Sequence, residues 1–582
     1  MTARALAKFW ESTHADRAIA IGLALFYFVL LLASAAGLGY ARDEGFYFAA
    51  SRAYAAWFEL LFRDPAAAVE ASAVDRVWVH NHEHPALMKS LFALSHWLFS
   101  ERYELLDPGT AHRVAGMGVS SIAIGVVYAW GRRALGSRVA GLLAALFLGA
   151  MPRVFFHAHL ACFDMPVAAL FVATAYAYAR SAEHGGVGWP LATGVLYGLL
   201  LDTKHNAWLL PPALVLHALL LCRARAFRDL ARGRVVIPRA LLAMVVIGPL
   251  VFYAGWPWLW RDTAARFADY VAFHTGHEYY NMEFWGHTYW QPPMPLGYAW
   301  VMTIATVPAV TLAAFVFGAA SVLSHGLRAR LLPGAGRLYA SRLRGTLERW
   351  RLGPLPAGLD ARRRYSTELL WLLGVAVSYA PWLRDTTPIF GGTKHWMTAY
   401  PFMALLAARG VERALALAVS GWKRRRAAAA TAGVVAAAAA APLVSTVQSH
   451  PWGLSAYAPL VGGAPGAASL GLNRTFWGYT TGAAESFLNE HAPPNARVYV
   501  HDTALQSWDM LQRDGRLRSD LVGTLSIVGS SLSLYHHEQH MQRVEHQIWV
   551  DYGTAAPSYV GTFQGVPVIW VYERPRVAVM AP

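Results

Sequence analysis

Four long apolar runs constrain the fold of this chain more than any other feature of its sequence. They contain no Asp, Glu, Lys or Arg, and they cover residues 18–39, 241–260, 298–323 and 427–447. Each is long enough to cross a hydrocarbon layer about 30 Å thick as a helix. The 582-residue chain is 56% hydrophobic and only 15% charged, whereas soluble proteins carry about 25% charged residues. We therefore predict a polytopic α-helical membrane protein.

The positions of the basic residues predict how the chain is oriented. Although the net charge of +15 is compatible with nucleic-acid binding, the arginines gather in short segments between apolar runs. Such clusters are typical of cytoplasmic topology signals, so we expect no nucleic-acid partner. The clusters are residues 132–138, 223–234, 328–364 and 423–426. This orientation leaves the N-terminus in the cytoplasm and residues 40–111, 153–163, 261–296, 384–396 and all those after 448 outside.

Hydrophobicity and these charges together predict a membrane domain over residues 1–447 with about eleven spans. The predicted spans are residues 18–39, 112–131, 139–152, 164–179, 189–201, 206–221, 238–258, 297–323, 366–383, 397–417 and 427–447. The three shortest could instead be buried helices. The usage of alanine and arginine is typical of a GC-rich bacterial genome, so we expect the bacterial inner (plasma) membrane.

The last part of the chain has shorter apolar runs separated by turns. We predict a linker over residues 448–481, centred on the glycine-rich stretch 462–471, and a small extracytoplasmic α/β domain over 482–582. Its predicted elements are a strand at 496–501, a helix at 503–513 capped by Thr503, a polar helix at 533–547 and a hairpin of 559–563 with 566–572, turning at Gln564-Gly565.

Two adjacent carboxylates, Asp43 and Glu44, follow the first apolar run. They could simply end the span at the membrane interface, or they could be catalytic residues. The chain has 45 Arg but only five Lys, and three of these lysines fall in elements predicted on the outer face. They are Lys89, Lys204 and Lys394, accompanied by His84, His205 and His395. A compact ammonium can act as a point charge for a phosphate, although snorkelling to the interface would also place lysines there.

These motifs carry a family resemblance. Asp43-Glu44, then His84-Pro85-Ala86-Leu87-Met88-Lys89, then Asp164, then Thr203-Lys204-His205 together resemble the protein O-mannosyltransferase superfamily, which includes bacterial lipid A aminoarabinose transferases. The likeness covers roughly residues 15–420. Ala86 stands where the eukaryotic pattern usually has a second proline, and no β-trefoil repeats are present. The resemblance implies a GT-C fold with a catalytic acid in the first extracytoplasmic loop, residues 40–111.

The resemblance also implies an activity. Such an enzyme moves a sugar from a polyprenyl-phosphate carrier, here undecaprenyl phosphate, to a hydroxyl of a lipid, glycan or protein acceptor. We expect Asp43 to act as the base of an inverting displacement, with Glu44 as the alternative base or as a support for Asp43 or the sugar. The phosphate and sugar would be bound by residues drawn from the lysine motifs and Asp164: Lys89, His84, Asp164, Lys204, His205, Lys394 and His395. Asp164 could equally be a helix cap.

No cofactor is required by this chemistry, but a divalent metal is a further hypothesis. His80, His82 and Glu83 are crowded together and are suitable ligands, although their spacing matches no specific metal motif. The His-rich run 536–540 is expected to be a solvated helix face. Residues 262–296 are rich in aromatics and could be an interfacial belt or a mobile cover for the active site.

Two alternatives from other classes remain open at this point. A transporter or flippase that binds a polyprenyl-phosphate sugar would need paired charges at mid-membrane depth and two related halves. The chain contains no evident half-repeat, and its ionisable residues gather at one predicted face. A non-catalytic relative is disfavoured by the intact Asp43, Glu44 and lysines. Both observations favour an enzyme.

Overall fold

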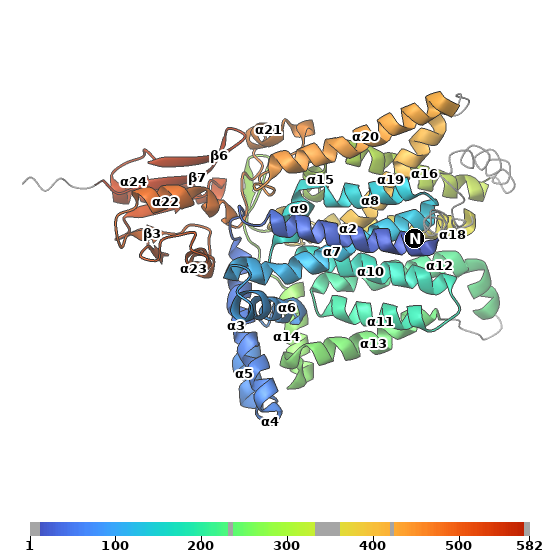
Figure 1. Ribbon diagram of the computed structural model, residues 1–582, viewed down its shortest axis with the longest axis horizontal. Coiled ribbons are helices and arrows are strands. Elements are labelled where there is room, and N and C mark those ends of the chain that lie inside the picture. Colours follow the sequence, from blue (N-terminus) through green and yellow to red (C-terminus); the bar gives the residue numbers. More distant parts are fainter. Residues whose placement is uncertain (1–11, 231–236, 332–360, 420–423, 576–582) are drawn as a thin grey trace, which may run out of the picture.

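The chain folds into a long helical bundle with an α/β domain at one end (Figure 1). The computed structural model describes residues 12–230, 237–331, 361–419 and 424–575. Twelve helices of the described residues make up the bundle: α2 (Thr13–Ala33), α7 (Pro108–Leu135), α8 (Arg138–Gly149), α10 (Asp164–Glu183), α11 (Gly188–Leu201), α12 (Leu210–Leu230), α13 (Arg239–Gly255), α15 (Tyr298–Thr306), α16 (Ala309–Leu331), α18 (Ala361–Tyr379), α19 (Tyr400–Ala418) and α20 (Arg424–Ser449).

The outer surface of the bundle is apolar, as expected for a membrane domain. Phe26, Val245 and Val447 are 66%, 72% and 75% exposed, and apolar surface of this kind is stable only against lipid or another protein. Among the described residues, three helices are each long and apolar enough to cross a membrane: α2, α7 and the Arg426–Ser449 part of α20. The predicted number of about eleven spans stays a prediction, since several of the other bundle helices are shorter.

The prediction of a loop over residues 153–163 is wrong, because most of this segment is helical. Residues 152–159 make the helix α9 (Pro152–His159), which follows α8 at an angle of 69°. Pro152 is at the first helical position, where its missing N–H costs nothing. All the side chains of α9 are buried, so this segment is part of the core rather than an exposed connection.

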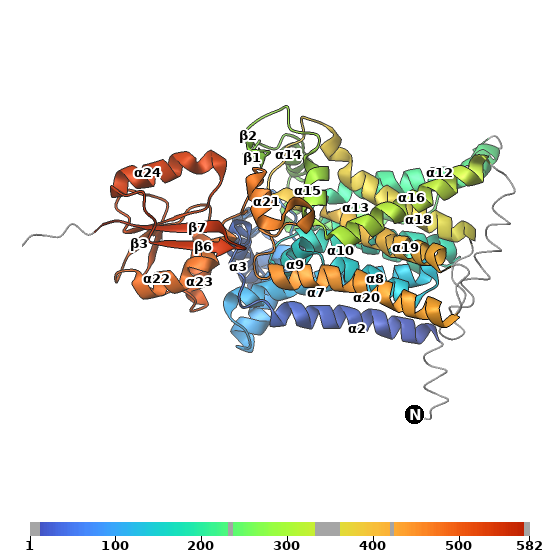
Figure 2. The same ribbon diagram turned by 90° about the horizontal axis from the view of Figure 1, so that it is seen from above.

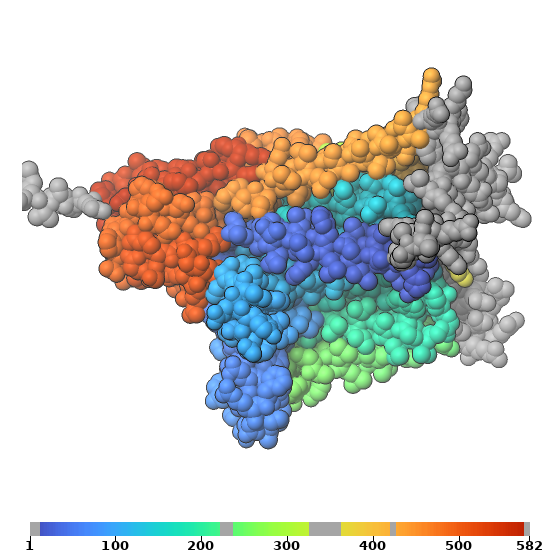
Figure 3. Space-filling model, viewed as in Figure 1, coloured from blue at the N-terminus to red at the C-terminus, as the bar shows by residue number. Residues whose placement is uncertain are grey.

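Short elements gather at the end of the bundle that carries the α/β domain (Figures 1 and 2). They are α3 (Arg42–Arg63), α4 (Pro65–Ala68), α5 (Ala71–Trp78), α6 (Leu87–His96), a π-helical turn (Trp97–Arg102), α14 (Thr263–Thr275), β1 (Met282–Phe284) and β2 (His287–Tyr289). In the space-filling view, α3–α5 project sideways from this end (Figure 3). Asp43 and Glu44 therefore open a new helix, α3, instead of ending the first span.

The C-terminal domain is a five-stranded sheet in the order β4-β3-β5-β7-β6. Its strands are β3 (Arg497–Tyr499), β4 (Val522–Thr524), β5 (Leu532–Tyr535), β6 (Tyr559–Phe563) and β7 (Val566–Glu573). β3 is parallel to β4 and β5, while β7 is antiparallel to β5 and β6. Helices α22 (Glu485–His491) and α23 (Leu505–Arg513) cover one face, and α24 (Gln542–Tyr552) covers the other (Figure 2). The β6–β7 hairpin predicted at Gln564-Gly565 is confirmed.

Two other predictions for this region are wrong. The expected helix at 533–547 is a buried central strand, β5, followed by α24, because pairing with β3 and β7 overrides local helix propensity. Ala504, not Thr503, precedes α23, and the Thr503 hydroxyl donates to the carbonyl of Gly478 instead. The expected linker contains a helix, α21 (Gly463–Ser469), and the buried side chains of Trp477 and Tyr479.

Candidate active site

Asp43 lies in the first turn of α3, facing the segment that precedes α19. Its Oδ2 accepts a hydrogen bond from Nζ of Lys394 at 3.2 Å, and Nε of Arg42 lies 3.9 Å from Oδ1. The Asp43 side chain is 22% exposed, so the carboxylate is accessible. Burial raises the pKa of Asp43, but Lys394 and Arg42 outweigh it and hold the pKa below its ordinary value. Asp43 is therefore an accessible carboxylate that stays ionised.

A turn with unusual backbone geometry brings Lys394 to this position. Gly391 has a φ of +69°, and a Cβ there would lie 2.6 Å from the indole of Trp477 and 2.7 Å from Cε of Lys394. Only glycine allows both this φ and this close approach. The Lys394 ammonium lies 4.3 Å from the centre of the Trp477 ring, a distance at which cation–π attraction contributes.

A second acid–lysine pair lies beside the first. Asp164 is the first residue of α10, where the helix dipole favours a carboxylate, and its Oδ1 accepts a 2.5 Å hydrogen bond from Nζ of Lys204. The ring nitrogen Nδ1 of His157 lies 3.7 Å from the other carboxylate oxygen. His157 also packs edge-on against Trp477 at 5.5 Å. The Trp477 indole is therefore contacted from both sides, by Lys394 of the first pair and by His157 of the second.

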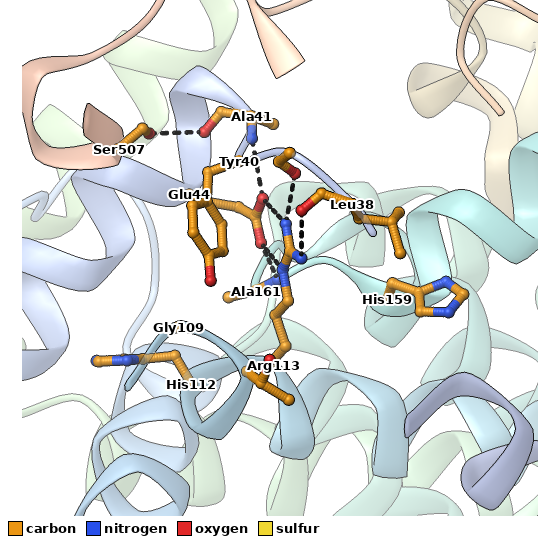
Figure 4. Close-up of polar contacts among 12 residues, drawn as sticks. Leu38, Tyr40, Ala41, Glu44, Gly109, His112, Arg113, His159, Ala161 and Ser507 are labelled. Carbon is orange, nitrogen blue, oxygen red and sulfur yellow. Dashed lines mark hydrogen bonds and ion pairs between the residues drawn. The ribbon is translucent and has the colours of Figure 1, made fainter. Parts of the chain in front are cut away.

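Glu44 has surroundings quite unlike those of its neighbour (Figure 4). Its side chain has no exposed surface, and both oxygens accept hydrogen bonds of 2.7 Å from Arg113. The backbone N–H groups of Ala41 and Ala161 each donate a further bond of 2.9 Å. Arg113 in turn donates to the carbonyl of Gly39. With its acceptor positions occupied, Glu44 fastens α3 to α7 and to the chain after α9, and it is poorly placed to take a proton from a substrate.

Lys89 and His84 do not join the two acid–lysine pairs. The fully buried Lys89 ammonium donates to the carbonyls of Asn81 at 2.5 Å and His84 at 2.8 Å. Burial lowers the pKa of Lys89 to about 7 and that of His84 well below its ordinary value. The His84 ring packs edge-on against the rings of Tyr47 and Phe163. Lys89 thus holds the 81–84 turn, and His84 packs among aromatic rings.

His205 and His395 also serve packing in the structure. The His205 ring stacks on His274 with centres 4.0 Å apart. His395 contacts Trp382 at 4.9 Å and is hydrogen-bonded through Nε2 with Phe390. Burial lowers the pKa of His395 well below its ordinary value, so this ring is neutral at pH 7.

The histidines proposed as metal ligands before Pro85 are not brought together. His82 faces Trp258 with ring centres 4.8 Å apart, and its Nδ1 is 2.9 Å from the carbonyl of Val79. Glu83 accepts a hydrogen bond from Asn81. His80 contributes its backbone carbonyl to Tyr54. Within the described parts of the chain, the groups able to hold a metal do not include His80, His82 or Glu83.

The His-rich run 536–540 was predicted to be a solvated helix face, and this is wrong. His536 has no exposed surface and Glu538 is 5% exposed. The run leaves the end of β5 and turns toward the bundle, where His540 contacts Glu283 beside β1. Residues 262–296 form α14 and the β1–β2 hairpin, and their His277 and Tyr280 rings cover Phe390, close to Lys394.

Several residues of the site were missed in the sequence. Arg153 is 2% exposed, and its Nε and Nη2 have no hydrogen-bond partner among the described residues. It lies over the rings of Tyr457 and Phe476, which come from the segment expected to be a linker. Arg42 is paired at 2.9 Å with Asp502 of the C-terminal domain. An arginine within a mostly apolar stretch is the sequence signal that could have identified Arg153.

Comparison with known proteins supports the resemblance noted in the sequence. Residues 83–253 match the family described as dolichyl-phosphate-mannose-protein mannosyltransferase, so the resemblance is confirmed over this part of the chain. Of the site residues, His84, Lys89, Asp164, Lys204 and His205 lie inside the matched part, while Asp43 and Lys394 lie outside it. No curated protein sequence matches the chain.

Two solved structures show similarity at low identity. The crystal structure of ArnT from Cupriavidus metallidurans bound to undecaprenyl phosphate is 15% identical, with 97% of this chain and 98% of that chain covered and a TM-score of 0.43. The crystal structure of the same protein in the apo state is also 15% identical, with coverage of 95% and 97% and a TM-score of 0.41.

Proposed function

We propose that this membrane protein, which resembles the dolichyl-phosphate-mannose-protein mannosyltransferases over residues 83–253, is a glycosyltransferase. It moves a sugar from a polyprenyl-phosphate carrier, taken to be undecaprenyl phosphate, to an acceptor hydroxyl. The site lies at the end of the bundle that carries the C-terminal domain (Figure 1). In a bacterial inner membrane with the N-terminus in the cytoplasm, this end faces the periplasm. The observation that carries the proposal is the accessible Asp43 carboxylate held beside Lys394.

Asp43 acts as the general base in this proposal. Its lowered pKa keeps the carboxylate ionised at neutral pH, which is the form required to accept a proton. The acceptor oxygen attacks the anomeric carbon as its proton passes to Asp43, and the bond between that carbon and the carrier phosphate breaks. The phosphate leaves with the bonding electrons from the opposite side of the sugar, so the configuration is inverted.

Cations near Asp43 stabilise the departing phosphate. Lys394 and Lys204 are each paired with a carboxylate in the structure, and the Nε and Nη2 nitrogens of Arg153 have no hydrogen-bond partner among the described residues. A phosphate leaving group needs charge neutralisation rather than protonation, so lysines and an arginine suffice without a general acid. Asp164 then either binds a sugar hydroxyl or keeps Lys204 in position. Glu44 supports Asp43 by holding the start of α3.

The test compares Asp43→Asn with wild type in purified protein reconstituted into lipid vesicles, with a series of polyprenyl-phosphate sugars as donors. Loss of a general base reduces turnover by about 10²- to 10⁴-fold. Glu59→Gln is the matched control, because Glu59 is on the same helix and its side chain is 56% exposed.

Donor binding is measured in parallel, so that a loss of sugar transfer can be distinguished from a loss of donor binding. Reduced turnover with retained binding in Asp43→Asn supports a base at this position. Turnover equal to that of Glu59→Gln would overturn the assignment of Asp43. Donor binding by wild type without transfer to any hydroxyl acceptor would instead favour a transporter or flippase that binds the polyprenyl-phosphate sugar.

A further inference from the structure

A second cluster of ligand-type side chains lies between the bundle and the C-terminal domain and includes none of the lysines of the active site. Glu283 comes from β1, in the aromatic loop before α15. Glu538 and His540 come from the run that follows β5. One ligand atom from each of the three lies within 4.8 Å of those of the other two. Their side chains are only 5% to 7% exposed. Carboxylates and an imidazole thus meet in a buried position from two distant parts of the chain.

The distances within this cluster fit the coordination shell of a metal ion. Oε1 of Glu283 lies 3.0 Å from Nδ1 of His540, and Oε2 of Glu538 lies 3.5 Å from the same nitrogen. The side-chain amide of Asn281 lies 3.2 Å from His540 Nδ1 and 3.5 Å from Glu538. Ligands bound about 2.0–2.2 Å from one zinc ion in a tetrahedral site are separated by about 3.4 Å. The ligand atoms of Glu283, Glu538 and His540 are therefore close enough to share one ion, and the Asn281 amide lies next to two of these side chains.

The groups of the cluster also make hydrogen bonds to one another. The backbone N–H of His540 donates to Oε1 of Glu283 at 2.9 Å, and the Asn281 amide donates to Oε2 of Glu538 at 3.5 Å. The oxygen and nitrogen of an asparagine amide are assigned from their surroundings and can be exchanged. With the Asn281 oxygen turned inward, four lone-pair donors would face one another, which a cation resolves. The other ring nitrogen of His540, Nε2, is buried without a hydrogen-bond partner in the described chain.

The local charge favours a cation as well. Glu283 and Glu538 are 6% and 5% exposed, so two carboxylates are buried close to each other here. The nearby Arg42 guanidinium is already engaged by Asp502 at 2.9 Å. Buried carboxylates without sufficient positive charge are costly unless they are protonated or bind a metal. A divalent ion would supply positive charge to the two buried glutamates.

We propose that Glu283, Glu538 and His540, with the Asn281 amide oxygen, form a structural site for a divalent transition-metal ion, most favourably Zn²⁺. An imidazole combined with carboxylates suits zinc better than Mg²⁺ or Ca²⁺, which prefer oxygen ligands alone. A cavity lined by Glu283, Arg474, His537 and Gln539 adjoins the cluster and gives the ion a route in.

The ion would fasten the β1–β2 hairpin to the C-terminal domain beside the active site. Just before the hairpin, the rings of His277 and Tyr280 lie against Phe390, next to Lys394. On the other side, Asp502 connects the cluster to Arg42 and so to Asp43. Zinc would therefore hold together the two parts of the chain that border the site, in the way that structural metals fix small domains.

The test measures zinc content and requires no donor or acceptor, so its outcome is independent of the proposed glycosyltransferase activity. Full-length protein in detergent is stripped with a chelator, incubated with Zn²⁺, desalted and analysed by mass spectrometry for bound metal. Glu283→Gln and His540→Gln are compared with two controls, Glu278→Gln and His546→Gln, which change exposed residues of the same loop and the same domain.

We expect both site variants to hold one zinc per chain less than the controls, and wild type to gain thermal stability on adding Zn²⁺ while His540→Gln does not. Zinc content equal to that of the controls in both site variants would overturn the proposal. If Glu283→Gln fails to fold, Glu283→Asp is used, with a zinc affinity expected to fall by about 10- to 100-fold. Unchanged affinity in that variant would likewise overturn it.

Discussion

Asp43 and Glu44 are adjacent in the chain, yet their surroundings differ. Asp43 lies with Lys394 in an accessible group of charges, the open cluster, whereas Glu44 lies with Arg113 in a fully buried one, the closed cluster. Glu44 has no exposed surface, and its oxygens receive four hydrogen bonds, two of them from Arg113. Asp43 is 22% exposed and receives one hydrogen bond, from Lys394. Because consecutive residues on a helix point in directions about 100° apart, one faces the core and the other the site. A satisfied buried pair supports structure, whereas an incompletely satisfied and accessible carboxylate can take part in chemistry.

Removing a partner from the closed cluster should give the largest effect on stability. Arg113→Met leaves the buried Glu44 charge without its cation and is expected to reduce the free energy of unfolding by about 3–5 kcal/mol. The measurement is thermal unfolding in detergent. Arg513→Met is the control, since Arg513 forms an exposed pair with Asp509 of a kind that contributes about 0.2–1 kcal/mol. Equal melting temperatures for the two variants would contradict a structural role for the Glu44–Arg113 cluster.

Removing a partner from the open cluster should change activity rather than stability. Lys394→Met is expected to reduce kcat by about 10²- to 10³-fold, the usual effect of losing a group that stabilises developing charge. Its melting temperature should stay near that of wild type, since the ammonium is one partner of a partly exposed pair. A variant that melts early but turns over normally would assign Lys394 to the fold and not to the site.

The pH dependence provides a finer comparison at Asp43. Burial raises the pKa of Asp43, and Lys394 and Arg42 lower it below its ordinary value. A general base must be ionised, so activity is lost as the pH falls through this pKa. Removing the Lys394 charge raises the pKa, and the acidic limb of the kcat/KM profile in Lys394→Met should move to higher pH. An acidic limb at the same pH in both proteins would show that another group controls it.

The smallest effect is expected where the C-terminal domain meets the start of α3. The Ser507 hydroxyl donates a 3.0 Å hydrogen bond to the carbonyl of Ala41, next to the closed cluster (Figure 4). Ser507→Ala should reduce the free energy of unfolding by about 0.5–1.5 kcal/mol. Denaturation followed by intrinsic tryptophan fluorescence measures it. A loss of several kcal/mol would mean that this contact organises the domain interface more widely than one hydrogen bond can.

Local sequence patterns predicted elements whose geometry depends on nearby residues. The apolar runs became bundle helices, and the Gln564-Gly565 turn joins two strands as expected. The patterns failed for segments whose state depends on distant partners. The composition of residues 533–547 predicts one polar helix, yet residues 532–535 form the strand β5 because β3 and β7 pair with them on both sides. Residues 153–163 are predicted to be a short loop, yet residues 152–159 form the buried helix α9, which follows α8 at an angle of 69°.

The candidate site follows the same division. The outer-face lysines were recognisable from their rarity, but only Lys204 and Lys394 pair with a carboxylate, whereas Lys89 is used to hold a turn. Nothing near Lys89 in the sequence distinguishes it from the other two. Its difference arises from complete burial against backbone carbonyls, which is a property of the assembled fold.

The sequence by itself determined the class of this protein, a helical membrane domain followed by an α/β domain, because hydrophobic length and strand alternation are local properties. It also marked Asp43, Asp164 and the outer lysines as candidates. The tertiary structure decided which of them meet: Arg113 and Glu44 are 69 residues apart, His540 and Glu283 are 257 apart, and Lys394 and Asp43 are 351 apart. Charge pairing acts over a few ångströms in space, and only the folded chain brings such distant residues within that range.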